Sequence, residues 1–132
     1  MKWLSKKTTT PPQEMQQELP LPLSKTEVAA RDAAQAKSLI GATLSLATYT
    51  AQFAASLDQV VQSNSATPKT VEALSYALWE MVSLTMNMCD QLRTLAYTFS
   101  PLSQISPNKD QVLFAAETIE TVMVEISEQF DL

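Results

Sequence analysis

The chain has 132 residues, the size of one ordinary domain, and a net charge of −5. Apolar residues make up 45% of it, which is enough for a hydrophobic core and excludes a wholly disordered protein. With a single glycine and no histidine, the chain is poor in the residue that tight β-turns need, and it lacks the commonest general base and metal ligand.

Residues 1–23 are predicted to form a Pro-rich N-terminal arm, flexible or extended, outside the folded domain. The segments "TTTPPQ" and "LPLPL" hold four of the seven prolines, and proline lacks the amide donor that helices and sheets require. Alternating leucine and proline favour an extended, polyproline-like conformation. A groove of the same molecule or of a partner is the alternative place for these leucines.

A first helix is predicted from residue 25 to about 63. Ser24 followed by Glu27 is typical of a capping box, and no proline occurs again until Pro68. Apolar doublets recur seven residues apart, with further apolar residues between them: Leu39-Ile40, Leu46-Ala47, Phe53-Ala54 and Val60-Val61, then Leu44, Ala51 and Leu57. So wide a stripe fits a helix with two neighbours, and its alanines and Gly41 favour close approach. Because this helix is the longest, we expect a bend near Gly41, or a partner or the arm covering its N-terminal half.

Two more helices are predicted at 68–99 and 107–130. Thr67-Pro68 and Ser106-Pro107 are both typical helix starts. The expected core positions, spaced by three and four, are Val71, Leu74, Leu78, Met81, Thr85, Met88, Leu92, Leu95 and Phe99 in the second helix, and Val112, Ala116, Ile119, Met123, Ile126 and Phe130 in the third. Three heptad-patterned helices with short connections predict an all-α fold, an antiparallel three-helix bundle of residues 24–132.

Four sulfur side chains occur within "MVSLTMNMC", residues 81–89, and raise the question of a soft-metal site. On a helical wheel, Met81 and Met88 share the predicted core stripe. Cys89 lies on the flank of that stripe, and Met86 lies nearly opposite. Copper(I) requires thioether or thiolate ligands aimed at one point. We therefore interpret the cluster as packing and predict no metal and no cofactor.

No enzymatic site is predicted. Cys89 has no histidine to act as its base, so we expect a buried, inert thiol. Four glutamates of the third helix suggest paired carboxylates: Glu117, Glu120, Glu125 and Glu128. The dimetal motif of helical bundles needs Glu-x-x-His, which is absent, so a solvated acidic face is expected. A chain with one glycine also offers no phosphate-binding loop.

A second face of helix 68–99 is the predicted interface. Its members belong mainly to residue types enriched where proteins meet: Tyr76, Trp79, Met86, Arg93 and Tyr97. On the wheel they lie away from the predicted core stripe, with Tyr76 at the edge. We expect contact here with another copy or another protein. The alternatives are cover by the arm, plain exposure, or a wide buried arc on the middle helix.

These features predict a non-enzymatic protein–protein interaction module, such as a small adaptor, chaperone or assembly factor, with a homo-oligomer as the expected state. The alternative is an amphipathic protein on a lipid or granule surface, for which Trp3 and the lysines of "MKWLSKK" suit a headgroup zone. The acidic balance argues against nucleic acid as a partner and disfavours contact with anionic membranes. One cysteine, no secretory-signal pattern and no long apolar run favour a cytoplasmic location.

Overall fold

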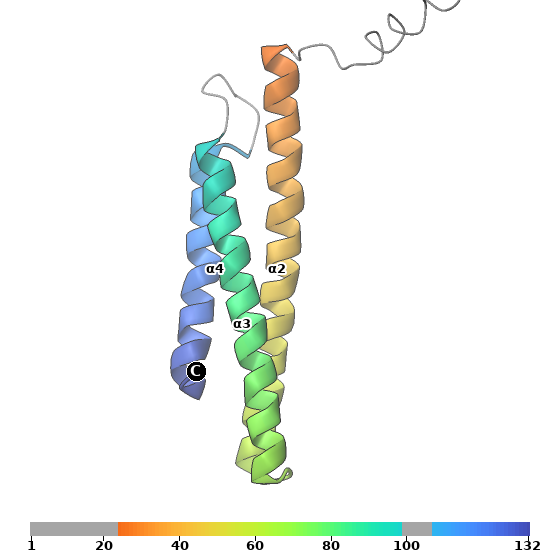
Figure 1. The fold of residues 1–132 in the computed structure, drawn as a ribbon, viewed down its shortest axis with the longest axis vertical. Coiled ribbons are helices and arrows are strands. Elements are labelled where there is room, and N and C mark those ends of the chain that lie inside the picture. Colours follow the sequence, from red (N-terminus) through yellow and green to blue (C-terminus); the bar gives the residue numbers. More distant parts are fainter. Residues whose placement is uncertain (1–23, 99–106) are drawn as a thin grey trace, which may run out of the picture.

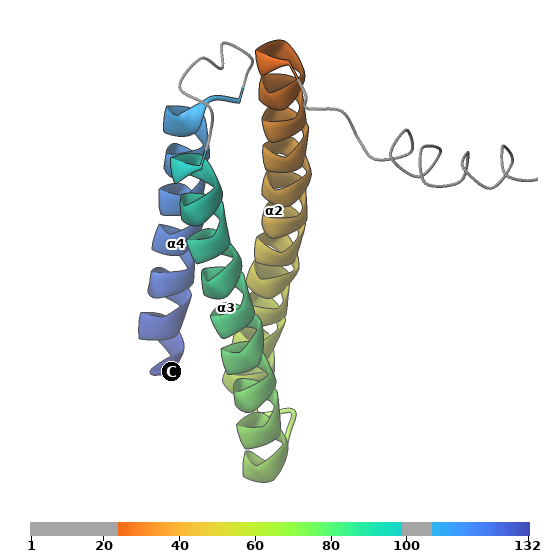
Figure 2. The ribbon, with the colours of Figure 1, turned by 45° about the horizontal axis from the view of Figure 1, so that its top comes forward.

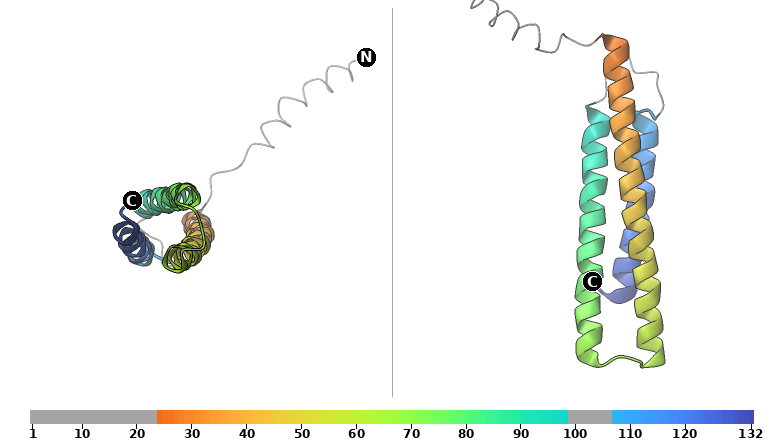
Figure 3. Two further views of the ribbon diagram at one scale, coloured as in Figure 1. Left: turned by 90° about the horizontal axis from the view of Figure 1, so that it is seen from below. Right: turned by 90° about the vertical axis from the view of Figure 1, so that its right-hand side faces the viewer.

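The computed structural model describes residues 24–98 and 107–132, so the predicted arm at 1–23 and Phe99 lie outside the described residues. The described residues form three helices and no strand: α2 (Lys25–Ser63), α3 (Pro68–Tyr97) and α4 (Lys109–Phe130). Consecutive helices run in opposite directions (Figure 1), and seen end-on they occupy the corners of a triangle (Figure 3). This arrangement confirms the predicted all-α, antiparallel three-helix bundle.

The ends of α2 follow from local side-chain chemistry. The Ser24 hydroxyl accepts a hydrogen bond from the Glu27 amide at 3.1 Å, and the Glu27 carboxylate accepts one from the Ser24 amide at 3.0 Å. The bond from the Ser24 amide, with a smaller contribution from the Ser24 side chain, favours the charged carboxylate and lowers the pKa of Glu27. At the other end Asn64 takes the left-handed conformation, with φ of 57°, and its amide bonds to the Val60 and Val61 carbonyls. Both ends lie where the sequence predicted them.

Gly41 neither bends α2 nor permits a close helix contact, so both of these expectations are wrong. The helix is uninterrupted over 39 residues (Figure 2), and a Cβ added at Gly41 would meet no atom within 4 Å. The first turns of α2 extend past the adjacent ends of α3 and α4 (Figure 1). Ala29, Asp32 and Ala33 are nevertheless buried there. Cover by the arm or by a partner stays a prediction.

The start of α3 is confirmed and the start of α4 is corrected. Thr67 caps α3 by accepting the Thr70 amide at 3.2 Å, with Pro68 at the first helical position. By contrast, α4 begins at Lys109 and not at 107, because Asn108 is its N-cap. The Asn108 and Gln111 side chains each accept the other's backbone amide at 3.0 Å. This reciprocal pair satisfies two amides that a cap at Ser106 would leave to other partners.

Two hydrophobic clusters fill the space between the helices. The upper cluster lies beside the N-terminal half of α2 and contains Ala36, Cys89, Leu92, Ala96, Val112, Ala116 and Ile119. The lower cluster lies beside the C-terminal half of α2 and contains Ala54, Leu57, Leu78, Val82, Met123 and Ile126. The α4 prediction is therefore confirmed, with Phe130 half-buried against the lower cluster.

The buried stripe of α3 is rotated from its predicted position. It consists of Leu78, Val82, Thr85, Cys89, Leu92 and Ala96, and its centre lies about 60° round the helix from Met81. Met81, Met88 and Leu95 are half-buried at one edge of this stripe. The rotation arises because α4 packs against the side that carries Cys89 and Ala96, which share one hydrophobic cluster with Val112, Ala116 and Ile119 of α4.

The centre of the α2 stripe consists of small and hydroxyl-bearing residues at every seventh position, Ala29, Ala36, Thr43 and Thr50, and ends with the larger Leu57. Most of the predicted apolar doublets flank this column and are only half-buried. Leu44, Ala51 and Val61, which were expected in the stripe, are exposed. Apolar size therefore predicted the buried side of α2 but not the centre of that side.

Buried threonines lie between the two clusters. Thr50 of α2 and Thr85 of α3 are fully buried, and their hydroxyl oxygens are 3.5 Å apart. Each hydroxyl also donates to the carbonyl four residues earlier, at 2.7 Å in both cases. Thr43, also fully buried, makes the same bond to Leu39 at 2.6 Å. Within the described residues, each of these three buried hydroxyls therefore has a partner in its own helix.

Replacing Gly41 with alanine is expected to raise the free energy of unfolding by about 0.5–1 kcal/mol, because alanine restricts the unfolded chain and meets no steric conflict here. Urea melts followed by circular dichroism measure the change. Ala42→Gly at the exposed neighbouring position is the matched control and should lower stability by a similar amount. Destabilisation by Gly41→Ala would show that another group occupies this space.

The double variant Thr50→Val/Thr85→Val is expected to be as stable as the wild type or more stable, by up to about 2 kcal/mol. Valine keeps the volume and removes two buried hydroxyls whose desolvation opposes their modest hydrogen-bond gain. Thr48→Val removes the same type of bond from an exposed threonine, where the change should stay within about 0.5 kcal/mol. A loss above about 1 kcal/mol in the buried pair means that the Thr50–Thr85 contact stabilises the bundle.

Candidate interaction surfaces

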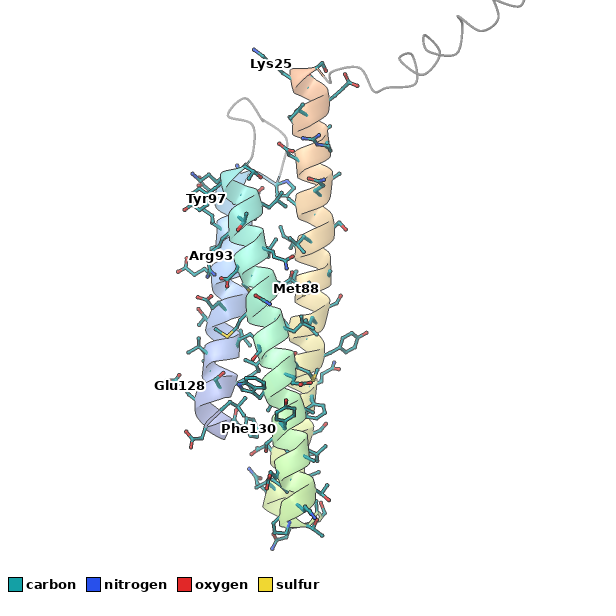
Figure 4. The ribbon with its side chains drawn as sticks, in the orientation of Figure 1. Lys25, Met88, Arg93, Tyr97, Glu128 and Phe130 are labelled. Atoms are coloured by element: carbon teal, nitrogen blue, oxygen red, sulfur yellow. The ribbon has the colours of Figure 1, made fainter. Side chains whose placement is uncertain are left out.

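The four sulfur side chains of residues 81–89 lie on different sides of α3. Cys89 belongs to the upper cluster, whereas Met86 packs against the lower one. Met81 and Met88 are half-buried on the opposite edge of the helix, and Figure 4 shows Met88 on the side of α3 that borders α2. Met86 was expected nearly opposite the core, and its packing against the lower cluster corrects that expectation. These positions do not aim four sulfur atoms at one point.

Cys89 has no solvent exposure. Burial raises the pKa of its thiol, and this effect outweighs the lowering by the nearby Arg93 guanidinium. The Glu120 and Asp90 carboxylates raise it further. A buried thiol with a raised pKa is a poor nucleophile at neutral pH, so Cys89 acts as a core residue.

The acidic residues of α4 do not form a metal centre. Glu117, Glu125 and Glu128 are exposed, and Glu120 is half-buried beside Arg93. Over residues 24–98 and 107–132, no three histidine, cysteine, aspartate or glutamate side chains gather closely enough to hold a metal ion.

The residues of the predicted α3 interface do not form one surface in the structure. Figure 4 shows Arg93 and Tyr97 on the side of α3 that borders α4. The Arg93 guanidinium pairs with Glu120 of α4 at 2.9 Å and with Asp90 at 2.9 Å, and these contacts raise its pKa. Arg93 therefore links two helices, and Met86 lies in the same inter-helix seam. Neither side chain stands on an open stripe away from the core.

The three aromatic members of the predicted interface are exposed at two separate places. The rings of Tyr76 and Trp79 pair with centroids 5.7 Å apart, and the two residues are 61% and 46% exposed. Tyr97, which is 68% exposed, has the Lys109 ammonium 4.4 Å from its ring centroid. Because charged groups accompany Tyr97, the α3–α4 side of the bundle is a mixed polar and aromatic surface.

A more uniform apolar surface lies on the other side of α3, where the groove between α2 and α3 opens to solvent away from α4. We call it the α2–α3 face. Its apolar members are Leu39, Leu46, Tyr49 and Phe53 of α2, and Met81, Leu84, Met88 and Leu95 of α3. Leu39 and Leu95 line the upper part of the groove together with Gln35.

Helical periodicity places the exposed members of this face near the groove residues. In α2, Tyr49 lies two heptads from Gln35, and in α3, Leu84 lies eleven residues from Leu95. Measured around the helix axis, each is therefore within about 40° of a residue that lines the groove. The two also share one level of the bundle, because each directly precedes a residue of the Thr50–Thr85 contact. Tyr49 is 63% exposed and Leu84 is 54% exposed.

The centre of the α2–α3 face carries no charge. No charged residue occurs between Lys37 and Asp58 of α2, or from Met81 to Cys89 of α3. Glu80 directly precedes the uncharged run of α3. The sequence interpretation missed this face because it assigned Met81 and Met88 to the core centre and did not use Tyr49 or Leu84. The two uncharged runs were the signal that identifies it.

No known protein family, curated protein or solved structure matches this chain. Among the described helices, none is both long enough and apolar enough to cross a membrane. The candidate surfaces therefore rest on their own geometry and chemistry.

We expect iodoacetamide to alkylate Cys89 at least about a hundredfold more slowly in the native chain than in urea, because the thiol is buried and protonated. Mass spectrometry over time measures the rate. In a Ser83→Cys variant, the added exposed thiol on the same helix should react at nearly the unfolded rate. Rapid labelling of Cys89 in the native chain at neutral pH would show that it is accessible and would reopen a role as a nucleophile.

Proposed function

We propose that this chain is a non-enzymatic protein-interaction module that binds a protein partner through the α2–α3 face. The observation that carries the proposal is the exposure of Tyr49 and Leu84, 63% and 54%, at the centre of an uncharged apolar surface. Half-buried Phe53, Met81 and Met88 border them. Contiguous apolar surface of this kind on a soluble domain is commonly a binding site.

The composition of the face supports a protein partner over a lipid surface. Tyrosine, phenylalanine and methionine are enriched at protein interfaces, where aromatic rings bury a large area at a small entropic cost. Helices that lie on membranes usually carry lysine or arginine beside the apolar stripe. The uncharged segments 38–57 and 81–89 contain neither residue.

Site-specific photo-crosslinking in cells that express the chain tests this proposal. A benzophenone amino acid at position 84 should give crosslinked protein species at several times the yield obtained at position 44. Leu44 is the matched control, because it is a leucine of similar exposure, 49%, that lies outside the α2–α3 face. The difference is expected because only position 84 lies where the partner excludes water.

Equal, background-level yields at positions 49, 84 and 44 would contradict the proposed function. Flotation with vesicles of phosphatidylcholine and phosphatidylserine tests the lipid alternative. The protein is expected to stay in the dense fraction; co-flotation that Leu84→Lys abolishes would assign the face to lipid.

A further inference from the structure

We infer that the partner of the α2–α3 face is a second copy of this chain, so that two α2–α3 layers pack face to face as a four-helix assembly. This inference rests on the proposed function and specifies the ligand of the same surface. The α2–α3 face thus replaces the surface predicted from the sequence as the place of self-association. That surface lies on the α3–α4 side, where Arg93 and Glu120 already pair.

The distribution of charge makes the α2–α3 face the suitable one for self-contact. The chain carries a net charge of −5, so two copies repel each other unless their acidic groups stay apart. Six acids and one lysine occur from Lys109 to Asp131, on or adjoining α4. Because α4 covers the opposite side of the α2–α3 layer, face-to-face packing directs both acidic helices outward. The contact itself then joins two uncharged surfaces.

The uncharged part of the face is large enough for a small specific interface. Residues 38–57 of α2 extend for about 30 Å, and two adjacent helices together are about 18 Å wide. Contact along this length would cover about 540 Å² per copy, or about 1,100 Å² in total, which is above the roughly 1,000 Å² expected of a biological interface. The exposed Tyr49 and Leu84 lie near the middle of that area, where buried anchors contribute most to affinity.

Two-fold symmetry is compatible with the positions of these residues. In a face-to-face pair the symmetry axis lies in the plane of contact. An axis at the level of the Thr50–Thr85 contact, close to the middle of α3, gives the greatest overlap. If the axis runs across the helices, residue 84 of one copy lies near residue 84 of the other. If the axis runs along the helices, residue 84 of one copy lies near residue 49 of the other.

Sedimentation equilibrium of the full chain at about 100 μM and below tests the inference. The wild type should have twice the mass of one chain. The variant Tyr49→Lys/Leu84→Lys should dissociate with a dissociation constant at least about a hundredfold higher, because four lysines would face one another across the contact. Both positions are exposed within one copy, so the monomer should keep its helical circular dichroism.

The matched control is Leu44→Lys/Phe114→Lys, which adds the same charge at residues that are 49% and 72% exposed but lie outside the α2–α3 face. This variant should remain a dimer. Equal dissociation of both double variants would mean that added charge alone separates the copies, and it would overturn the assignment of the face.

Spin labels supply a second measurement that does not depend on disrupting the contact. In a Cys89→Ala background, labels at Leu84→Cys should lie within about 20 Å of each other across the dimer, since facing helices are about 8–10 Å apart. Labels at Phe114→Cys, on the outer side of α4, should be more than twice as far apart.

A monomeric wild type overturns the inference. If that monomer still gives crosslinks from position 84 to a different protein, the proposed function stands and only the second copy is wrong. A monomer without crosslinks at positions 49 and 84 overturns both.

Discussion

The column of small and hydroxyl-bearing residues at the centre of α2 is the constraint on which the rest of the structure depends, because it is the most deeply buried part of the longest helix. Within it Thr50 meets Thr85 of α3, with the two hydroxyl oxygens 3.5 Å apart, and Ala29, Ala36 and Thr43 continue the column above this level. Each hydroxyl bonds within its own helix, and the pair is therefore accommodated in an apolar core. The hydrophobic clusters lie above and below this contact.

The arrangement of the exposed surface follows from the same column of residues in α2. When threonine and alanine occupy the centre of α2, the larger Leu46 and Phe53 lie at the edge of the buried stripe and are only half-buried. On α3 the rotation toward α4 has a similar effect on Met81 and Met88. These side chains border the α2–α3 groove and form a continuous apolar face outside the core.

Charge divides the molecule into surfaces with different properties. The α3–α4 side combines aromatic rings with the Arg93–Glu120 pair, and α4 carries a concentration of carboxylates. The α2–α3 face has no charge at its centre. For an acidic chain, such a separation permits a close protein contact on one side while the other sides remain solvated and repel nonspecific neighbours.

Local sequence patterns were sufficient to predict the helices, since capping boxes, proline positions and heptad spacing depend on residues close together in the chain. They gave both ends of α2, the start of α3 and all five buried positions of α4. The rotation of α2 and α3 about their axes was decided only in the tertiary structure. A stripe with two neighbours is wide, and the part of it that is buried most deeply depends on which residues of the other helices pack against it, as Thr85 does at Thr50 and as α4 does at Cys89 and Ala96. That rotation placed Met86 and Arg93 in a seam and left Tyr49 and Leu84 exposed.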